Sequence, residues 1–310
     1  MKKFMVLLLS LMVFASLFSS TSAADNCQNY KTGMKVWWDG VELKPGQIGR
    51  LTIKKDTPLF KLNGEKRTLS RTLKAGEFYR IYAFKPGLLS VGGGYFVERD
   101  SRVTYQTPSK TKLEQVKQIQ VCTIASKSRA TFTLKDSNGT AYKVYAVGLD
   151  EQKAYGSFSS SATWNSVWAG ISEGDVLYKG NYRLYLQKLN SPVIANTGIQ
   201  IKDYVYNASR KMMYQVPTYY IGQPDLLAIA NTESSNFESA DLYYVHNGQL
   251  FRVKRSSSWA AIGYTTRPSA VDKLTYQTKD YNNAEGVWTL NTWTLNPNNA
   301  EIMLIDSQDY

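Results

Sequence analysis

Apolar and polar residues alternate over short stretches along most of the chain, and residues that favour turns separate these stretches. Residues 78–84 (FYRIYAF) alternate most clearly, and the pairs Asp39-Gly40 and Asn63-Gly64 mark turns before them. A period of two places successive side chains on opposite faces of a β-strand. The chain is 13% aromatic but only 20% charged, which favours half-buried strands over long solvated helices. The sequence therefore predicts an all-β protein.

The predicted strands fall into two domains on either side of a junction. Residues 25–107 hold about five or six short strands, which is enough for a small barrel. Residues 108–125 contain Pro108 and several lysines and are expected to form the junction, either as a short helix or as an extended connector. Residues 126–310 are expected to form a larger, aromatic-rich all-β domain.

The C-terminal domain contains a weak internal repeat. Residues 132–144, 176–186 and 241–253 each consist of an aromatic strand, a turn with glycine or Asn-Gly, and a second aromatic strand. The first two turns are separated by about the length of a four-stranded propeller blade, ~40–45 residues. Four such blades would fill residues 130–310, so the pattern predicts propeller-like repetition, with a β-sandwich or an irregular all-β domain as the alternative.

The N-terminal domain contains a pattern of known type. Residues 71–82 (RTLKAGEFYRIY) and 91–97 (VGGGYFV) place a turn of leucine, a basic residue, a small residue and glycine before a central strand, with a later glycine-aromatic-valine strand. This order resembles the bacterial SH3-like modules of secreted and wall-associated proteins of Gram-positive bacteria. Where those modules open with asparagine-valine-arginine-serine-glycine, this chain has LTIKKDTP at residues 51–58. The resemblance implies a small barrel that attaches the protein to cell wall or peptide and carries no catalytic residue.

The first 24 residues have the composition of a secretory signal peptide. Lys2 and Lys3 precede an apolar run over residues 4–18, and small residues follow at 21–24. The run is shorter than the ~20 apolar residues that a spanning helix needs, although an uncleaved membrane anchor is the alternative. We expect cleavage after Ala23 or Ala24, and a secreted, extracellular protein without a transmembrane segment.

The chain has two cysteines, Cys27 and Cys122. In an extracellular protein a disulfide between them would persist, and we expect this pairing. Two separate free thiols are the alternative, because a single pair does not make a disulfide framework.

Positive charge is concentrated in the first third of the chain. Residues 25–112 hold 17 lysines and arginines against 8 acidic residues, whereas residues 113–310 hold 18 against 17. A cationic module attracts polyanions, so we expect a cell-wall polyanion as partner. A solvated basic surface without a partner is the alternative, and secretion argues against nucleic acid. The predicted binding residues are Lys54, Lys55, Lys66, Arg67, Arg71 and Lys74.

Aromatic rings are the second candidate binding feature. The chain has 22 tyrosines and 7 tryptophans, and such rings combine an apolar face with a polar group, which suits interfaces. Packing in the core would account for most of them. As residues that bind a glycan or a surface protein we predict Tyr219, Tyr220, Tyr243 and Tyr244.

The sequence contains little that indicates catalysis. With one histidine, His246, and two cysteines, it lacks the residues for a zinc, haem or iron–sulfur site, and we expect no cofactor and no metal. Asp280, Asn282, Asn283 and Glu285 do not match an EF-hand calcium loop and are expected to form a polar turn. A hydrolase of wall glycan would need two carboxyl groups. Its candidates are Glu173, Asp175, Asp203, Asp225, Glu233, Glu238 and Asp241.

These features together predict a secreted, non-catalytic binding protein at the cell wall or cell surface. A secreted hydrolase that uses carboxyl groups to act on wall glycan is the alternative.

Overall fold

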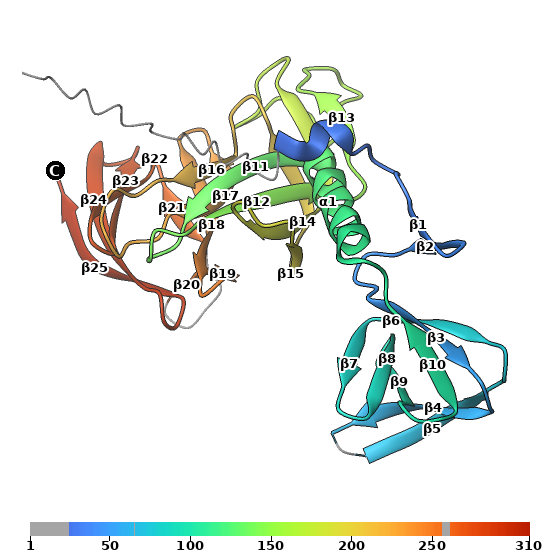
Figure 1. Cartoon of the computed structure of the whole chain (residues 1–310). Helices are drawn as coiled ribbons and strands as arrows, with labels where there is room; N and C mark the ends of the chain where they lie inside the picture. Colours follow the sequence, from blue (N-terminus) through green and yellow to red (C-terminus); the bar gives the residue numbers. More distant parts are fainter. Residues whose placement is uncertain (1–24, 65, 256–260) are drawn as a thin grey trace, which may run out of the picture.

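The computed structural model describes residues 25–64, 66–255 and 261–310, and most of these residues lie in β-sheets (Figure 1). The predicted all-β class is therefore confirmed. The predicted signal peptide, residues 1–24, and Trp259 of the aromatic-rich region lie outside the described residues. Among the helices of the described part, none is long and apolar enough to cross a membrane.

The N-terminal region contains two antiparallel sheets around one core. The three-stranded sheet consists of β3 (Gly49–Ile53), β6 (Phe78–Ile81) and β10 (Val103–Gln106). The five-stranded sheet consists of β4 (Thr57–Asn63), β5 (Lys66–Leu73), β7 (Ala83–Lys85), β8 (Leu88–Gly92) and β9 (Tyr95–Glu98). Alternate residues point inward, and the core contains Leu51, Ile53, Leu59, Leu73, Ile81, Leu89, Val97 and Val103. The strands thus form two sheets and not one closed barrel.

A helix, α1 (Lys110–Lys127), occupies the predicted junction and lies between the N-terminal and C-terminal sheets in Figure 1. It begins where the Ser109 hydroxyl accepts a hydrogen bond from the Lys112 amide. Val116 packs on the hairpin of β1 (Val36–Trp38) and β2 (Val41–Leu43), whereas Val121 packs against one C-terminal sheet. The predicted 25–107 barrel included this hairpin, whose buried side chains instead pack against α1.

The predicted disulfide between Cys27 and Cys122 is confirmed. It joins the 3-10 helix η1 (Asp25–Asn29) to α1, with 5.5 Å between the Cα atoms and a sequence separation of 95. The beginning of the described chain is therefore anchored to the helix beside the C-terminal sheets.

Residues 128–310 form three sheets of five strands. The first contains β11 (Ser128–Lys135), β12 (Ala141–Gly148), β13 (Gln152–Tyr155), β14 (Val176–Lys188) and β15 (Ile194–Asn207). The second contains β16 (Met213–Val216), β17 (Leu226–Ser234), β18 (Phe237–His246), β19 (Gln249–Arg252) and β21 (Ile262–Tyr264). The third contains β20 (Lys254–Arg255), β22 (Thr266–Asp272), β23 (Thr275–Asn282), β24 (Val287–Asn296) and β25 (Glu301–Asp309).

The three sheets share one apolar core, which runs from Leu134 on β11 to Ile302 on β25. The prediction of four blades is therefore wrong for the described residues, because the domain is divided among three sheets. The error came from strand length. β14 has 13 residues and β15 has 14. This one hairpin is therefore as long as two of the short hairpins on which the prediction of four blades was based.

Candidate ligand-binding site

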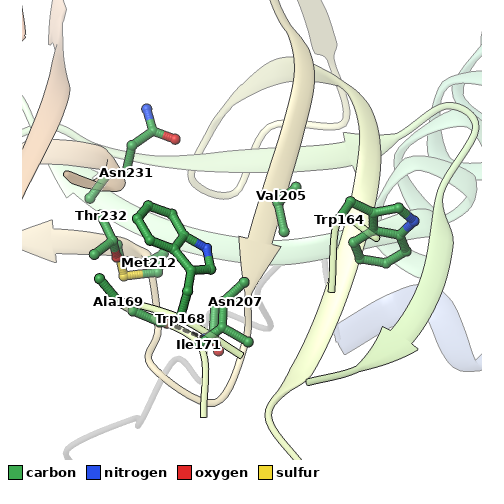
Figure 2. A pocket seen from close by; sticks show the side chains of 11 residues that line it. Trp164, Trp168, Ala169, Ile171, Val205, Asn207, Met212, Asn231 and Thr232 are labelled. Carbon is green, nitrogen blue, oxygen red and sulfur yellow. Dashed lines mark hydrogen bonds between the residues drawn. The ribbon is translucent and has the colours of Figure 1, made fainter. Parts of the chain in front are cut away.

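The loop of residues 156–175, between β13 and β14, carries two tryptophans to the wall of a pocket (Figure 2). The pocket has a volume of about 310 Å³, and the indoles of Trp164 and Trp168 stand on opposite sides of Val205 in Figure 2. The lining residues come from the loop (Trp164, Trp168, Ala169, Gly170 and Ile171), from β15 and the turn that follows it (Val205, Asn207 and Met212), and from β17 (Ala230, Asn231 and Thr232).

Hydrogen bonds order the backbone around both tryptophans. The amide of Val167 donates to Ser157 O at 3.1 Å, and the Asn165 side chain donates to Tyr155 O at 2.8 Å. On the other side of Trp168, the amide of Ile171 donates to Trp168 O at 3.0 Å. Because these bonds hold the backbone of the loop, less ordering of the loop is needed when a ligand binds.

Asn207, at the end of β15, joins this loop to the sheet. Its buried amide group donates to Gly170 O at 3.0 Å and to the Asp175 carboxylate at 2.7 Å, and its oxygen accepts from the Arg210 amide at 3.1 Å. The Asp175 carboxylate also accepts from the Ser172 amide at 2.9 Å. These contacts make Asn207 and Asp175 structural residues of the loop.

Gly170 allows the loop to lie directly against β17. A Cβ at this position would lie 2.2 Å from Thr232 Oγ1, and the φ of +85° disfavours any other residue. The close approach brings Trp168 to the rim of the pocket beside Asn231 and Thr232.

A second, polar hollow of about 240 Å³ adjoins the first, because Trp164 lines both. Lys179 and Asp203 form an ion pair there at 3.2 Å, and Asp150 accepts two hydrogen bonds of 2.7 Å from the amide and the side chain of Asn181. These two bonds from Asn181 hold the pKa of Asp150 below its ordinary range, so its carboxylate is ionised at neutral pH.

The arrangement of these residues is suited to binding a ligand. Its apolar walls are two indole rings, and its polar groups at the rim are an amide and a hydroxyl. Pockets of this kind, from about 300 Å³ upwards, hold small ligands or one unit of a larger chain. A molecule with apolar faces and polar edges fits this combination.

The six predicted cationic residues all lie on the exposed surface of the N-terminal sheets. Three of them have partners in the chain: Arg67 pairs with Glu98 at 2.5 Å, Lys74 pairs with Asp56 at 2.7 Å, and Arg71 donates to the Tyr79 hydroxyl at 2.8 Å. The pairing with Asp56 raises the pKa of Lys74. Within the described residues, no ion pair involves Lys54, Lys55 or Lys66, so these three contribute their charge most fully to the surface.

The four predicted binding tyrosines divide into two pairs. Tyr219 and Tyr220 are exposed on the loop between β16 and β17. Tyr243 and Tyr244 are core residues of β18, and the prediction that they bind a ligand is wrong. In the sequence Asp241-Leu242-Tyr243-Tyr244-Val245 the central strand is covered on both faces, so the usual alternation of buried and exposed residues is absent.

The seven candidate catalytic carboxylates all have structural partners. Asp225 is fully buried and holds a loop, Asp175 joins the tryptophan loop to Asn207, and Glu173 accepts from the Phe158 amide at 2.7 Å. The remaining four bind a cation or a hydroxyl, in the pairs Asp203 with Lys179, Glu233 with Ser239, Glu238 with Arg267, and Asp241 with Arg252.

Of the residues considered for calcium binding, Asp280 is half-buried, and its carboxylate accepts from the Asn291 side chain at 2.8 Å through one oxygen while the other oxygen has no hydrogen-bond partner among the residues that the structure describes. Asn282 donates to Glu285 at 2.9 Å and accepts from the Ala284 amide at 3.0 Å, which makes a polar turn between β23 and β24. The ring of His246 lies against Tyr244 and Phe251. In the part of the chain that the structure describes, no group of three histidine, cysteine or acidic residues is arranged to hold a metal ion.

Sequence reasoning did not single out Trp164 and Trp168 among the many rings. The available signal was their position in residues 156–175, a serine- and glycine-rich segment without alternation. Tryptophans in such a segment are not required by the core of a strand. They are therefore better candidates for ligand contact than tyrosines within a strand.

Comparisons of the chain with known protein families, curated proteins and solved structures gave no match.

Proposed function

We propose that this protein is a secreted carbohydrate-binding protein that holds a unit of a cell-wall or cell-surface glycan between Trp164 and Trp168. The observation that carries the proposal is the pocket itself, in which two indoles from a hydrogen-bonded loop face apolar residues with Asn231 and Thr232 at the rim. Sugar rings have apolar C–H faces and polar hydroxyl edges. Indole rings pack against the apolar C–H faces, and amide and hydroxyl groups form hydrogen bonds with the polar edges.

The size of the pocket favours a glycan over a protein surface as the ligand. A stable protein interface buries roughly 800 Å² on each partner and is close to flat, whereas this hollow is small and concave. The polar hollow on the other side of Trp164 extends the site. A chain of several sugar units would contact both hollows and Trp164 between them.

The cationic N-terminal module has a separate role in the proposal. It resembles the SH3-like modules of wall-associated proteins, and its exposed Lys54, Lys55 and Lys66 favour anionic wall polymers. In this proposal the module keeps the protein at the wall while the pocket binds the glycan.

The test measures binding of chito-oligosaccharides of one to six units, by calorimetry and by tryptophan fluorescence. We expect Trp168→Ala to weaken binding by about tenfold or more, because truncating an aromatic residue that stacks on a ligand typically removes ~1.4 kcal/mol or more. The matched control is Trp37→Ala, since Trp37 on β1 is 56% exposed and Trp168 is 58% exposed.

Equal weakening by both substitutions, or none by Trp168→Ala, would contradict the proposal for these glycans. Shortened oligosaccharides after prolonged incubation would instead support the hydrolase.

A further inference from the structure

The loop between β16 and β17 carries an apolar tip, which we define as Tyr219, Tyr220 and Ile221. These side chains are 86%, 40% and 95% exposed, respectively. Isolated apolar residues are common on protein surfaces, but three in succession at the end of one loop are not explained by packing.

A buried carboxylate fixes the base of this loop. Asp225 is fully buried and accepts hydrogen bonds from the amides of Lys135 and Thr218, both at 2.8 Å, and from the Gln215 side chain at 3.1 Å. A buried charge is unfavourable unless such bonds compensate it. The three hydrogen bonds to the Asp225 carboxylate therefore compensate for its burial and hold the loop in one shape.

Further buried polar contacts fix the other side of the base. The Gln223 side chain donates to Thr275 O at 3.1 Å and accepts from the Thr218 hydroxyl, and the Tyr276 hydroxyl donates to Pro224 O at 2.8 Å. The Tyr220 hydroxyl is bonded to Val271 O. Because the base is held on both sides, Tyr219 and Ile221 are kept pointing away from the protein surface.

Two lysines lie next to the tip. Lys135 donates through Nζ to Thr218 O at 3.4 Å, and Lys273 lies beside Gly222, where an added Cβ would be 3.2 Å from its Cε. Of the nearby acidic groups, Asp136 and Asp225 are buried and accept from backbone amides, whereas Asp272 is exposed and accepts from the Lys273 amide. The exposed charged residues beside the tip are therefore two lysines and one aspartate, with a net positive charge.

We propose that this tip docks on an anionic lipid surface. A tip of three residues is far smaller than the roughly 800 Å² that a specific protein interface buries on each side. A lipid interface needs no shape complementarity, and tyrosine favours the boundary between headgroups and acyl chains. Lysines near such a surface each add about 1 kcal/mol of attraction to anionic lipid.

The experiment must report on the tip itself, because the cationic N-terminal module can also attract vesicles. Both native cysteines form the disulfide, so Ile221→Cys introduces a single reactive thiol for an environment-sensitive fluorophore. On adding vesicles of phosphatidylcholine with phosphatidylglycerol to the full chain, we expect a blue shift and quenching by spin-labelled acyl chains. The matched control is Ile305→Cys on β25, which is also an exposed isoleucine.

A second measurement uses co-sedimentation with the same vesicles. Tyr219→Ser together with Ile221→Ser should weaken partitioning by about tenfold or more, since binding scales with the buried apolar area. Ile305→Ser should leave it unchanged, and thermal melting should show that all variants fold. An unshifted fluorophore at position 221, or equal shifts at positions 221 and 305, would overturn the proposal. Loss of glycan retention without loss of vesicle binding in the tip variant would overturn it as well.

Discussion

At the scale of single residues, tyrosine hydroxyls connect the C-terminal sheets to one another. Tyr204 on β15 donates to Ala230 O on β17 at 2.8 Å, and Tyr244 on β18 donates to Pro297 O after β24 at 2.6 Å. Burial raises the pKa of Tyr244 to about 12. The chain therefore uses much of its tyrosine content as core residues that also satisfy backbone carbonyls between strands.

We predict that Tyr244→Phe lowers the free energy of unfolding at pH 8 by about 1–3 kcal/mol, because Pro297 O loses a buried partner. The difference from wild type should shrink as the pH rises above about 10. Tyr244 ionises near pH 10 in the unfolded chain and near 12 in the folded one, so alkali favours the unfolded wild type, whereas phenylalanine does not ionise.

Urea denaturation at pH 8 and near pH 11 measures both effects. Tyr219→Phe is the control, because that side chain is exposed and should change stability at neither pH. A loss of stability with Tyr244→Phe that stays constant over this pH range would contradict the raised pKa.

At the scale of elements, the tryptophan loop depends on close contact with β17. Gly170 and Gly174 belong to the same loop and have nearly the same backbone, with φ of +85° and +80°. Only the first is in contact with β17, since a Cβ on Gly174 would meet no atom within 4 Å. Comparing alanine substitutions at the two glycines therefore separates the effect of backbone strain from the effect of losing the contact with β17.

We predict that Gly170→Ala weakens glycan binding strongly, because the loop must move away from Thr232 and take Trp168 with it. Gly174→Ala should retain binding while losing roughly 1 kcal/mol of stability from its unfavourable φ alone. Calorimetric titration and thermal melting of the two variants distinguish these effects. Equal glycan binding by the two variants would mean that the position of Trp168 does not depend on the contact between Gly170 and Thr232.

At the scale of the whole molecule, positive charge and the tryptophan pocket lie on different parts of the chain. The first third carries nearly all the excess charge, and α1 links it to the sheets that form the pocket. In the proposed function, this separation lets the protein contact an anionic polymer and a glycan chain at once, and two linked sites bind more tightly than either alone.

We predict that the full chain binds anionic cell walls and that binding weakens steeply as the salt concentration approaches 1 M, where the screening length falls to ~3 Å. Replacing Lys54, Lys55 and Lys66 by glutamine should weaken binding further. Replacing Lys117, Lys188 and Lys202, which are also exposed, removes the same charge elsewhere. Wall sedimentation compares the two triple variants, and equal losses would show that net charge alone matters.

Much of this protein's local structure was determined by sequence. Alternating residues and glycine turns specified strands, because side chains within one strand sort to two faces by a period of two. Cys27 and Cys122 were the only candidates for a disulfide. The uneven distribution of charge also followed from the sequence.

The tertiary structure alone decided how the strands were grouped and which rings reached a surface. Strand partners are chosen by contacts between distant segments, so three sheets formed where local repeats had suggested four blades. Tyr243 and Tyr244 became core residues because sheets cover both faces of β18, which no local pattern records. Trp164 and Trp168 form one pocket only because β15 and β17 meet their loop, and this is a consequence of packing across the fold.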